Sequence, residues 1–229
     1  ISSKHRQFES VTRIHFFMKY TSHSRENQDL FILAVTNSKR NGTYFEVGSN
    51  SPTKGNNTYL LEKEFGWTGV SMDIVERFVK DFNAVRKNPC LCVDATQTDL
   101  TCTMLEHGLG PHIDYLQLDI DPHFNTFKAL HNIDFDQVSF SVITYEHDAY
   151  QGGIKERTLS REFLKSKGYT LVVSDVCHRK NGKDLNFEDW YVNEQYMTST
   201  NWMKFCGEKT IMNTPEMSDN TRSLLDEMI

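Results

Sequence analysis

Four acidic side chains each stand at the end of a predicted β-strand. They are Glu46, Asp73, Asp94 and Asp119, in four successive strands. Parallel strands point the same way, so their carboxyl ends meet at one edge of a sheet, and these four side chains should gather there. A row of acids repels phosphate groups and suits a neutral or cationic ligand that offers hydroxyl and amino groups.

A second group of titratable residues follows two later strands that should lie side by side. Asp119 and Asp121 follow the first strand, and Glu146, His147 and Asp148 follow the second. A divalent cation such as Mg²⁺ or Mn²⁺, held by Asp119, Glu146 and His147, could bind and acidify a substrate hydroxyl. Alternatively, a side chain removes the hydroxyl proton directly, with His147 and Asp121 as the candidate catalytic residues.

The segment 43–74 positions the first two acids. It begins with a short apolar run typical of a buried parallel strand and continues with a polar, glycine-bearing loop at 48–57. A helix with apolar residues at 3–4 spacing begins near Thr58, and a second strand closes on Asp73. Open α/β sheets bind ligands at such a loop, and Asp73 is placed to accept hydrogen bonds from a ribose. The loop does not match G-x-G-x-x-G, which disfavours a dinucleotide enzyme.

Strands and helical runs alternate along the chain, which predicts an α/β fold: a Rossmann-like, doubly wound, mostly parallel sheet with an N-terminal helical segment. Residues 1–23 are the expected helical extension and 24–229 a single domain. The predicted strands are 44–47, 69–74, 90–93, 113–118, 138–144 and 169–176, with a late edge strand at 186–193. The predicted helices are 10–20, 25–36, 58–65, 75–87, 100–106, 125–130, 159–167 and 221–228, and Ser24 is the expected N-cap of the second.

The composition narrows the classes of partner. A net charge of −6 over 229 residues argues against nucleic acid. No apolar run approaches the roughly 18 residues of a membrane span, and no signal peptide is present. Five cysteines without a CxxC pair indicate reduced thiols in a cytoplasmic compartment rather than a zinc site or a disulfide framework. Because the chain starts at Ile1 and not at methionine, we expect it to be part of a longer protein with further domains.

Motifs between residues 24 and 193 resemble the FkbM-like group of S-adenosylmethionine-dependent methyltransferases. SRENQDLF at 24–31 resembles the segment that opens the family's domain, and NGTYFEVGSN at 41–50 resembles its first motif. The most specific stretch is NTYLLEKEFGWTGVSMD at 57–73. The likeness is looser in YLQLDID at 115–121, VITYEHD at 142–148 and EDWYVN at 188–193. Many relatives carry Glu-Gly where this chain has Asp121-Pro122, so the substrate side of the site is expected to differ.

The resemblance implies a class I methyltransferase fold that binds S-adenosylmethionine. Glu46 and the residues 48–50 would line its methionine part, Asp73 would bind the ribose, and Ile74 and Asp94 would flank the adenine. The full set of predicted cofactor-binding residues is Gln28, Glu46, Gly48, Ser49, Asn50, Asn57, Thr58, Asp73, Ile74, Asp94, Ala95 and Asp119.

The predicted function is therefore O-methylation of a sugar or glycan hydroxyl. A polyketide or other small-molecule hydroxyl is the alternative acceptor, and a non-catalytic Rossmann-like domain of a glycan-processing protein is the alternative of another class. Trp190 and Tyr191 could stack on a sugar ring, but aromatic pairs on late strands are more often core, which is our prediction here. His123 and His178 are further candidates to line the acceptor pocket.

Overall fold

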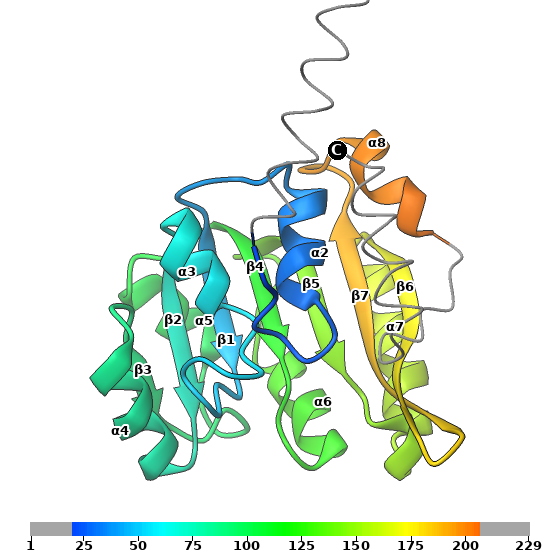
Figure 1. Ribbon diagram of the computed structural model, residues 1–229, viewed down its shortest axis with the longest axis horizontal. Helices are drawn as coiled ribbons and strands as arrows, with labels where there is room; N and C mark the ends of the chain where they lie inside the picture. The colour runs from blue at the N-terminus through cyan, green and yellow to red at the C-terminus, as the bar shows by residue number, and fades with distance from the viewer. Residues whose placement is uncertain (1–19, 207–229) are drawn as a thin grey trace, which may run out of the picture.

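A computed structural model describes residues 20–206 of the chain. Seven strands form its single sheet: β1 (Thr43–Val47), β2 (Thr68–Asp73), β3 (Cys90–Cys92), β4 (His112–Leu118), β5 (Ser139–Glu146), β6 (Tyr169–Lys180) and β7 (Lys183–Asn193). Their order across the sheet is β3-β2-β1-β4-β5-β7-β6 (Figure 1). β1 to β5 pair in parallel, and β7 runs antiparallel to both of its neighbours. The predicted Rossmann-like, doubly wound, mostly parallel sheet is thus confirmed.

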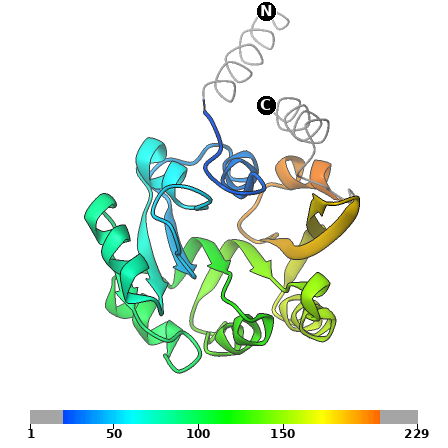
Figure 2. The ribbon, with the colours of Figure 1, turned by 60° about the horizontal axis from the view of Figure 1, so that its bottom comes forward.

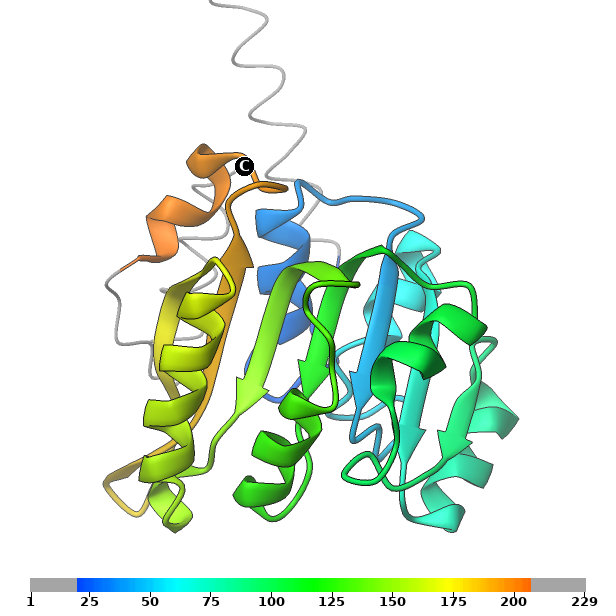
Figure 3. The same cartoon turned by 180° about the vertical axis from the view of Figure 1, so that it is seen from behind.

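Helices cover both faces of the sheet. One face carries α2 (Gln28–Val35), α3 (Tyr59–Phe65) and α4 (Glu76–Val85), and the other carries α5 (Leu100–Glu106), α6 (His123–His131) and α7 (Ile154–Ser166). Figure 3 shows the second face, and Figure 2 shows the sheet between its two helical layers. Short helices η1 (Ala149–Gln151), α8 (Ser199–Trp202) and η2 (Met203–Phe205) complete the described chain. No helix in residues 20–206 is long and apolar enough to span a bilayer.

Neighbouring residues of each strand supply the two halves of the core, because successive side chains of a strand point to opposite faces. Tyr44 packs in the cluster that contains the apolar residues of α2 and α3, whereas Phe45 packs with those of α5 and α6. Trp190 packs in the same cluster as Tyr44, and Tyr191 packs in the same cluster as Phe45; each is 1% exposed. The core interpretation of this aromatic pair is confirmed, and neither ring is available to a ligand.

Several predicted boundaries differ from the structure. The helix expected at 25–36 begins only at Gln28, because Asn27 adopts a left-handed conformation with φ 63°. Residues 186–193 were predicted at the sheet edge, and this is wrong: β7 lies between β5 and β6, and β6 forms the edge. α7 begins at Ile154 rather than 159. The predicted helix 221–228, and 10–20 except for its last residue, fall outside the described residues.

Candidate active site

A cavity of about 390 Å³ opens at the carboxyl ends of β1, β2 and β4, at the lower edge of the sheet in Figure 1. Its volume lies within the range usual for small-molecule sites. Ten of the twelve residues predicted to bind a cofactor line it: Gln28, Gly48, Ser49, Asn50, Asn57, Asp73, Ile74, Asp94, Ala95 and Asp119. Residues from six separate segments thus meet at one place, as the pattern of strand-end acids predicts.

Glu46 and Thr58, the other two predicted residues, do not line the cavity. Both are fully buried beneath it. A Glu46 carboxyl oxygen accepts hydrogen bonds from Thr58 Oγ1 and Asn56 Nδ2, each at 3.1 Å, and its other oxygen accepts one from Ser71 Oγ at 2.6 Å. Burial raises the pKa of Glu46 to about 7. These side chains hold the loop that lines the cavity instead of contacting a ligand.

Asp73 and Asp94 stand at the tips of neighbouring strands. The Asp73 carboxylate accepts hydrogen bonds from the backbone N–H of Asn50 at 2.9 Å and of Val75 at 2.8 Å. Asp94 accepts from the N–H and Oγ1 of Thr96, and these bonds lower the pKa of Asp94. A carboxylate has about four lone-pair positions, so Asp73 keeps free acceptors for two adjacent ligand hydroxyls. The exposed Ile74 side chain beside it offers an apolar surface.

Two further carboxyl groups lie on the inner wall of the cavity, and a third is buried behind them. Asp119 and Glu146 hydrogen-bond to each other, and burial raises the pKa of both, most strongly that of Glu146. Two carboxyl groups this close disfavour ionisation of both at once. Behind them Glu188, which is 1% exposed, accepts hydrogen bonds from Trp190 Nε1 at 2.6 Å and Gln28 Nε2 at 2.9 Å. Burial raises the pKa of Glu188 to about 8. Burial therefore favours the protonated form of these acids, and a bound cation would favour their ionised form.

We expect this buried acid to make stability fall as the pH rises. The Glu188 carboxyl titrates near 4.5 in the unfolded chain and near 8 in the folded one, so unfolding between these values releases a proton. The free energy of unfolding should then decrease by several kcal/mol from about pH 5.5 to about pH 8, at roughly 1.4 kcal/mol per pKa unit. Urea unfolding at both pH values measures it. Glu188→Gln keeps an acceptor for Trp190 and should flatten the dependence; an unchanged slope would contradict this assignment.

The predicted metal ligands Asp119, Glu146 and His147 do not form one site: Asp119 and Glu146 hydrogen-bond to each other, and His147 lies apart from them. Glu146 and His147 are successive residues at the end of β5, so their side chains leave opposite faces of the sheet. Glu146 instead joins Asp121 and Asp148, whose carboxylate oxygens all lie within 4.8 Å of one another. This trio lines the cavity beside Tyr150 and has the oxygen donors that Mg²⁺ prefers.

His147 is fully buried away from the cavity. Its Nδ1 accepts a hydrogen bond from the Ala149 N–H at 3.1 Å, so the proton of the neutral ring is on Nε2, 3.5 Å from Asp189 Oδ1. The Arg161 guanidinium donates hydrogen bonds to the two carboxylate oxygens of Asp189, at 2.7 and 2.8 Å. These oxygens therefore already have a cationic partner other than a metal ion. The structure therefore places His147 outside the cavity and apart from Asp119 and Glu146, with a ring nitrogen within 4.8 Å of carboxylate oxygens of Asp175 and Asp189 instead.

Other residues of the cavity were not predicted. Arg25, Gln117, Tyr150 and Phe187 line it, as do the apolar side chains of Met72 in β2, Phe78 in α4 and Val93 just after β3. Gln117 could have been found, because it lies two residues before Asp119 and so on the same face of β4. The others come from loops or from the β6–β7 hairpin and carry no periodic signal. His123 does not line the cavity and lies 3.6 Å from Glu156; the side chain of His178 is outside the described part.

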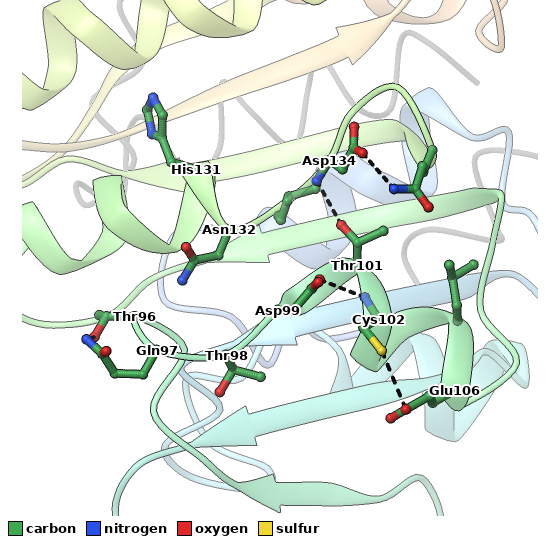
Figure 4. Close-up of a pocket in the computed structure, with 13 residues that line it drawn as sticks. Thr96, Gln97, Thr98, Asp99, Thr101, Cys102, Glu106, His131, Asn132 and Asp134 are labelled. Atoms are coloured by element: carbon green, nitrogen blue, oxygen red, sulfur yellow. Dashed lines mark hydrogen bonds between the residues drawn. The ribbon is translucent and has the colours of Figure 1, made fainter.

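A second hollow, about 830 Å³ and more open, lies beside α5 (Figure 4). Its polar groups are paired with one another: Asp99 accepts from the Cys102 N–H, and Thr101 Oγ1 accepts from the Asp134 N–H. Gln137 donates to Asp134 as well. Since these side chains already satisfy each other, the cavity at the strand ends is the better candidate site.

Comparison with models of protein families found no match, and comparison with curated proteins found none either. Solved structures with a similar fold include an O-methyltransferase from Bacillus cereus in complex with S-adenosylhomocysteine, 14% identical, with TM-score 0.49 over 80% of this chain and 89% of that one. The N-methyltransferase NodS from Bradyrhizobium japonicum, also with S-adenosylhomocysteine, is 9% identical, with TM-score 0.47 over 81% and 97%. A TehB-like S-adenosylmethionine-dependent methyltransferase from Corynebacterium glutamicum is 10% identical, with TM-score 0.44 over 85% and 100%. Each TM-score is below 0.5, and we base no functional conclusion on these likenesses.

Proposed function

We propose that the protein is an S-adenosylmethionine-dependent methyltransferase. The observation that carries this proposal is the chemistry of one cavity, in which Asp73, Asp94 and Asp119 follow β2, β3 and β4, on the two sides of β1 and its close turn at Gly48. Acids along the rim favour a ligand with a sulfonium, an ammonium and ribose hydroxyls, because each offers positive charge or donors. They disfavour the pyrophosphate of a dinucleotide, which needs N–H groups and cations.

Titration calorimetry with three ligands tests the cofactor. S-adenosylmethionine and S-adenosylhomocysteine should bind to the wild-type chain, and NAD should not. S-adenosylhomocysteine lacks the positive sulfonium. As the pH changes the ionisation of the acidic wall, the affinity for S-adenosylmethionine should therefore change by a different amount from the affinity for S-adenosylhomocysteine. Tight binding of NAD without binding of the other two would refute the proposal.

Asp73→Ala should weaken binding of S-adenosylmethionine by about 100-fold, because the ribose would lose charge-assisted hydrogen bonds. The carboxylate also receives the N–H groups of Asn50 and Val75, so the variant must first be shown to fold, by circular dichroism and thermal unfolding. Asp81→Ala, at an exposed acid of α4, is the matched control and should leave the affinity unchanged. If Asp73→Ala bound as tightly as the wild type, Asp73 would have no ribose role.

The acceptor is proposed to be a hydroxyl group, of a sugar or glycan in the first instance. When bound, S-adenosylmethionine supplies a sulfonium methyl group that an acceptor oxygen can displace in line. Asp121, Glu146 and Asp148 stand at the substrate side, and burial together with the charge of Asp121 raises the pKa of Asp148. A carboxylate with a raised pKa is a better acceptor for the hydroxyl proton, and we assign that proton to this trio instead of His147.

The same three carboxylates suit a divalent cation, and the two routes separate experimentally. Methyl transfer should survive treatment with EDTA if a carboxylate takes the proton directly. Loss of activity on chelation, restored by Mg²⁺ or Mn²⁺, would assign the trio to a metal that acidifies the hydroxyl. A screen of glycans, polyketides and small-molecule alcohols for labelled methyl transfer identifies the acceptor; binding of the cofactor without transfer to any of them would favour the non-catalytic alternative.

A further inference from the structure

We infer that Arg25 and Gln117 together recognise an α-amino acid group of the ligand, Arg25 through its carboxylate and Gln117 through its ammonium. The inference rests on the proposed function, since S-adenosylmethionine and S-adenosylhomocysteine carry such a group. Neither residue was found from the sequence pattern, and the two lie in different elements: Arg25 precedes α2, and Gln117 is in β4.

The turn that carries Arg25 is held firmly by one buried acid. Asp29, which is fully buried in the first turn of α2, accepts hydrogen bonds from Ser22 Oγ at 2.6 Å and from the N–H groups of His23 at 2.7 Å and Ser24 at 3.3 Å. In return, Ser24 Oγ accepts from the Asp29 N–H at 3.1 Å. These bonds tie the turn to the helix, so the position of Arg25 at the cavity needs no ligand to set it.

Arg25 is available to an anion. It is exposed, and it is the one arginine or lysine among the described residues that line the cavity. It forms no ion pair or hydrogen bond within residues 20–206, although its charge partly offsets the rise that burial causes in the pKa of Asp119. Its stem passes beside Gly55, where an added Cβ would lie 3.4 Å from Arg25 Cγ. A ligand carboxylate, which the acids of the cavity repel, would bind at this cation.

Gln117 presents an unpaired acceptor at the floor of the cavity. The residue is 4% exposed, and its Nε2 donates a long hydrogen bond of 3.4 Å to the Gly48 carbonyl, which fixes the amide orientation. Its Oε1 has no hydrogen-bond partner in the described part of the chain. A buried carbonyl oxygen without a partner is unfavourable, so a donor from the ligand is expected there. Asp119, on the same face of β4, would supply the charge that favours an ammonium donor.

Two ligands distinguish recognition of the amino acid group from a general effect on the structure of the cavity. S-adenosylhomocysteine has the amino acid group, and 5′-methylthioadenosine lacks it. Arg25→Met should weaken binding of S-adenosylhomocysteine by about 10-fold or more and change binding of 5′-methylthioadenosine by less than about twofold. Gln117→Met should behave in the same way, whereas Gln117→Glu, which keeps an oxygen for the ammonium, should retain the preference for S-adenosylhomocysteine.

Lys54→Met is the matched control, because Lys54 is a cation of the neighbouring loop that lines a separate hollow together with Arg25 and Tyr59 but does not line the cavity. It should leave both affinities unchanged. If Arg25→Met and Gln117→Met weakened the two ligands equally, their role would be structural and the inference would fall alone. If the wild-type chain bound neither ligand, the proposed function would fall and take the inference with it. Thermal unfolding of each variant confirms that it is folded before binding is compared.

Discussion

Replacing Arg86 with methionine is expected to lower the free energy of unfolding by about 3 to 5 kcal/mol. The guanidinium stands just after the last residue of α4, and its side chain is 1% exposed. It donates to Glu62 Oε2 at 2.8 Å, to the Pro52 carbonyl and Asn56 Oδ1 at 3.0 Å each, and to two hydroxyl groups, Thr58 Oγ1 at 3.0 Å and Tyr44 OH at 3.2 Å. All five N–H groups are therefore used. Removing them leaves a buried carboxylate and several buried acceptors without partners.

The loss should extend to ligand binding, because Arg86 anchors the loop that lines the cavity. Three of its acceptors, Pro52, Asn56 and Thr58, belong to the segment between β1 and α3. Its charge also offsets part of the rise that burial causes in the pKa of Glu46. We expect weaker binding of S-adenosylmethionine in addition to lower stability, even at temperatures where Arg86→Met remains folded. Binding is measured by calorimetry well below the melting temperature of the variant.

Arg77→Met is the control for Arg86→Met, because Arg77 lies on the same helix and carries the same charge. Its side chain is 85% exposed and lies 3.7 Å from Asp81, a surface pair worth less than about 1 kcal/mol. Urea unfolding should therefore show little change for Arg77→Met. A loss below about 1 kcal/mol for Arg86→Met as well would mean that its network does not stabilise the fold.

The strand-end acids could be predicted from the sequence because two strong regularities determine their position. A short apolar run marks a buried parallel strand, and all parallel strands of one sheet end at the same edge. Asp73, Asp94 and Asp119 follow directly from these rules, and the structure brings them to one cavity. Glu46 shows the limit of the same reasoning. It lies one residue before the end of β1, so it points beneath the cavity and not into it.

His147 was misplaced because the pattern YEHD does not reveal which side chain faces which side. The alternation of β5 puts Glu146 on the cavity side and His147 against Asp189 of β7. That partner could not be foreseen, because the antiparallel insertion of β7 between β5 and β6 depends on a long hairpin and not on local periodicity. Arg25 and Arg86 were missed for a related reason: charged residues outside a strand or helix pattern acquire their roles only through tertiary contacts.

Gly48→Ala is expected to destabilise the fold by about 4 kcal/mol or more, because overpacking and left-handed backbone strain each cost about 1 to 3 kcal/mol. The residue has φ 91°, and an added Cβ would lie 1.7 Å from the Asp119 carbonyl oxygen. Neither strand can move aside easily. The Gly48 N–H donates to the Met72 carbonyl at 2.9 Å, and the Asp119 N–H donates to the Val47 carbonyl at 3.0 Å, so β1 is fastened to both neighbours at this level.

Gly108→Ala separates the two causes. Gly108 has a similar φ of 75°, but no atom lies within 4 Å of its added Cβ, so only backbone strain of about 1 kcal/mol should appear. Urea unfolding of both variants measures the difference, and calorimetry with S-adenosylmethionine measures binding where Gly48→Ala is soluble. Equal losses of unfolding free energy for the two variants would mean that the close contact between the added Cβ and the chain at the end of β4 does not destabilise the fold. A larger loss at Gly48, together with lost binding, would show that the close approach of β1 and β4 shapes the floor of the cavity, where the Gly48 carbonyl and Gln117 meet.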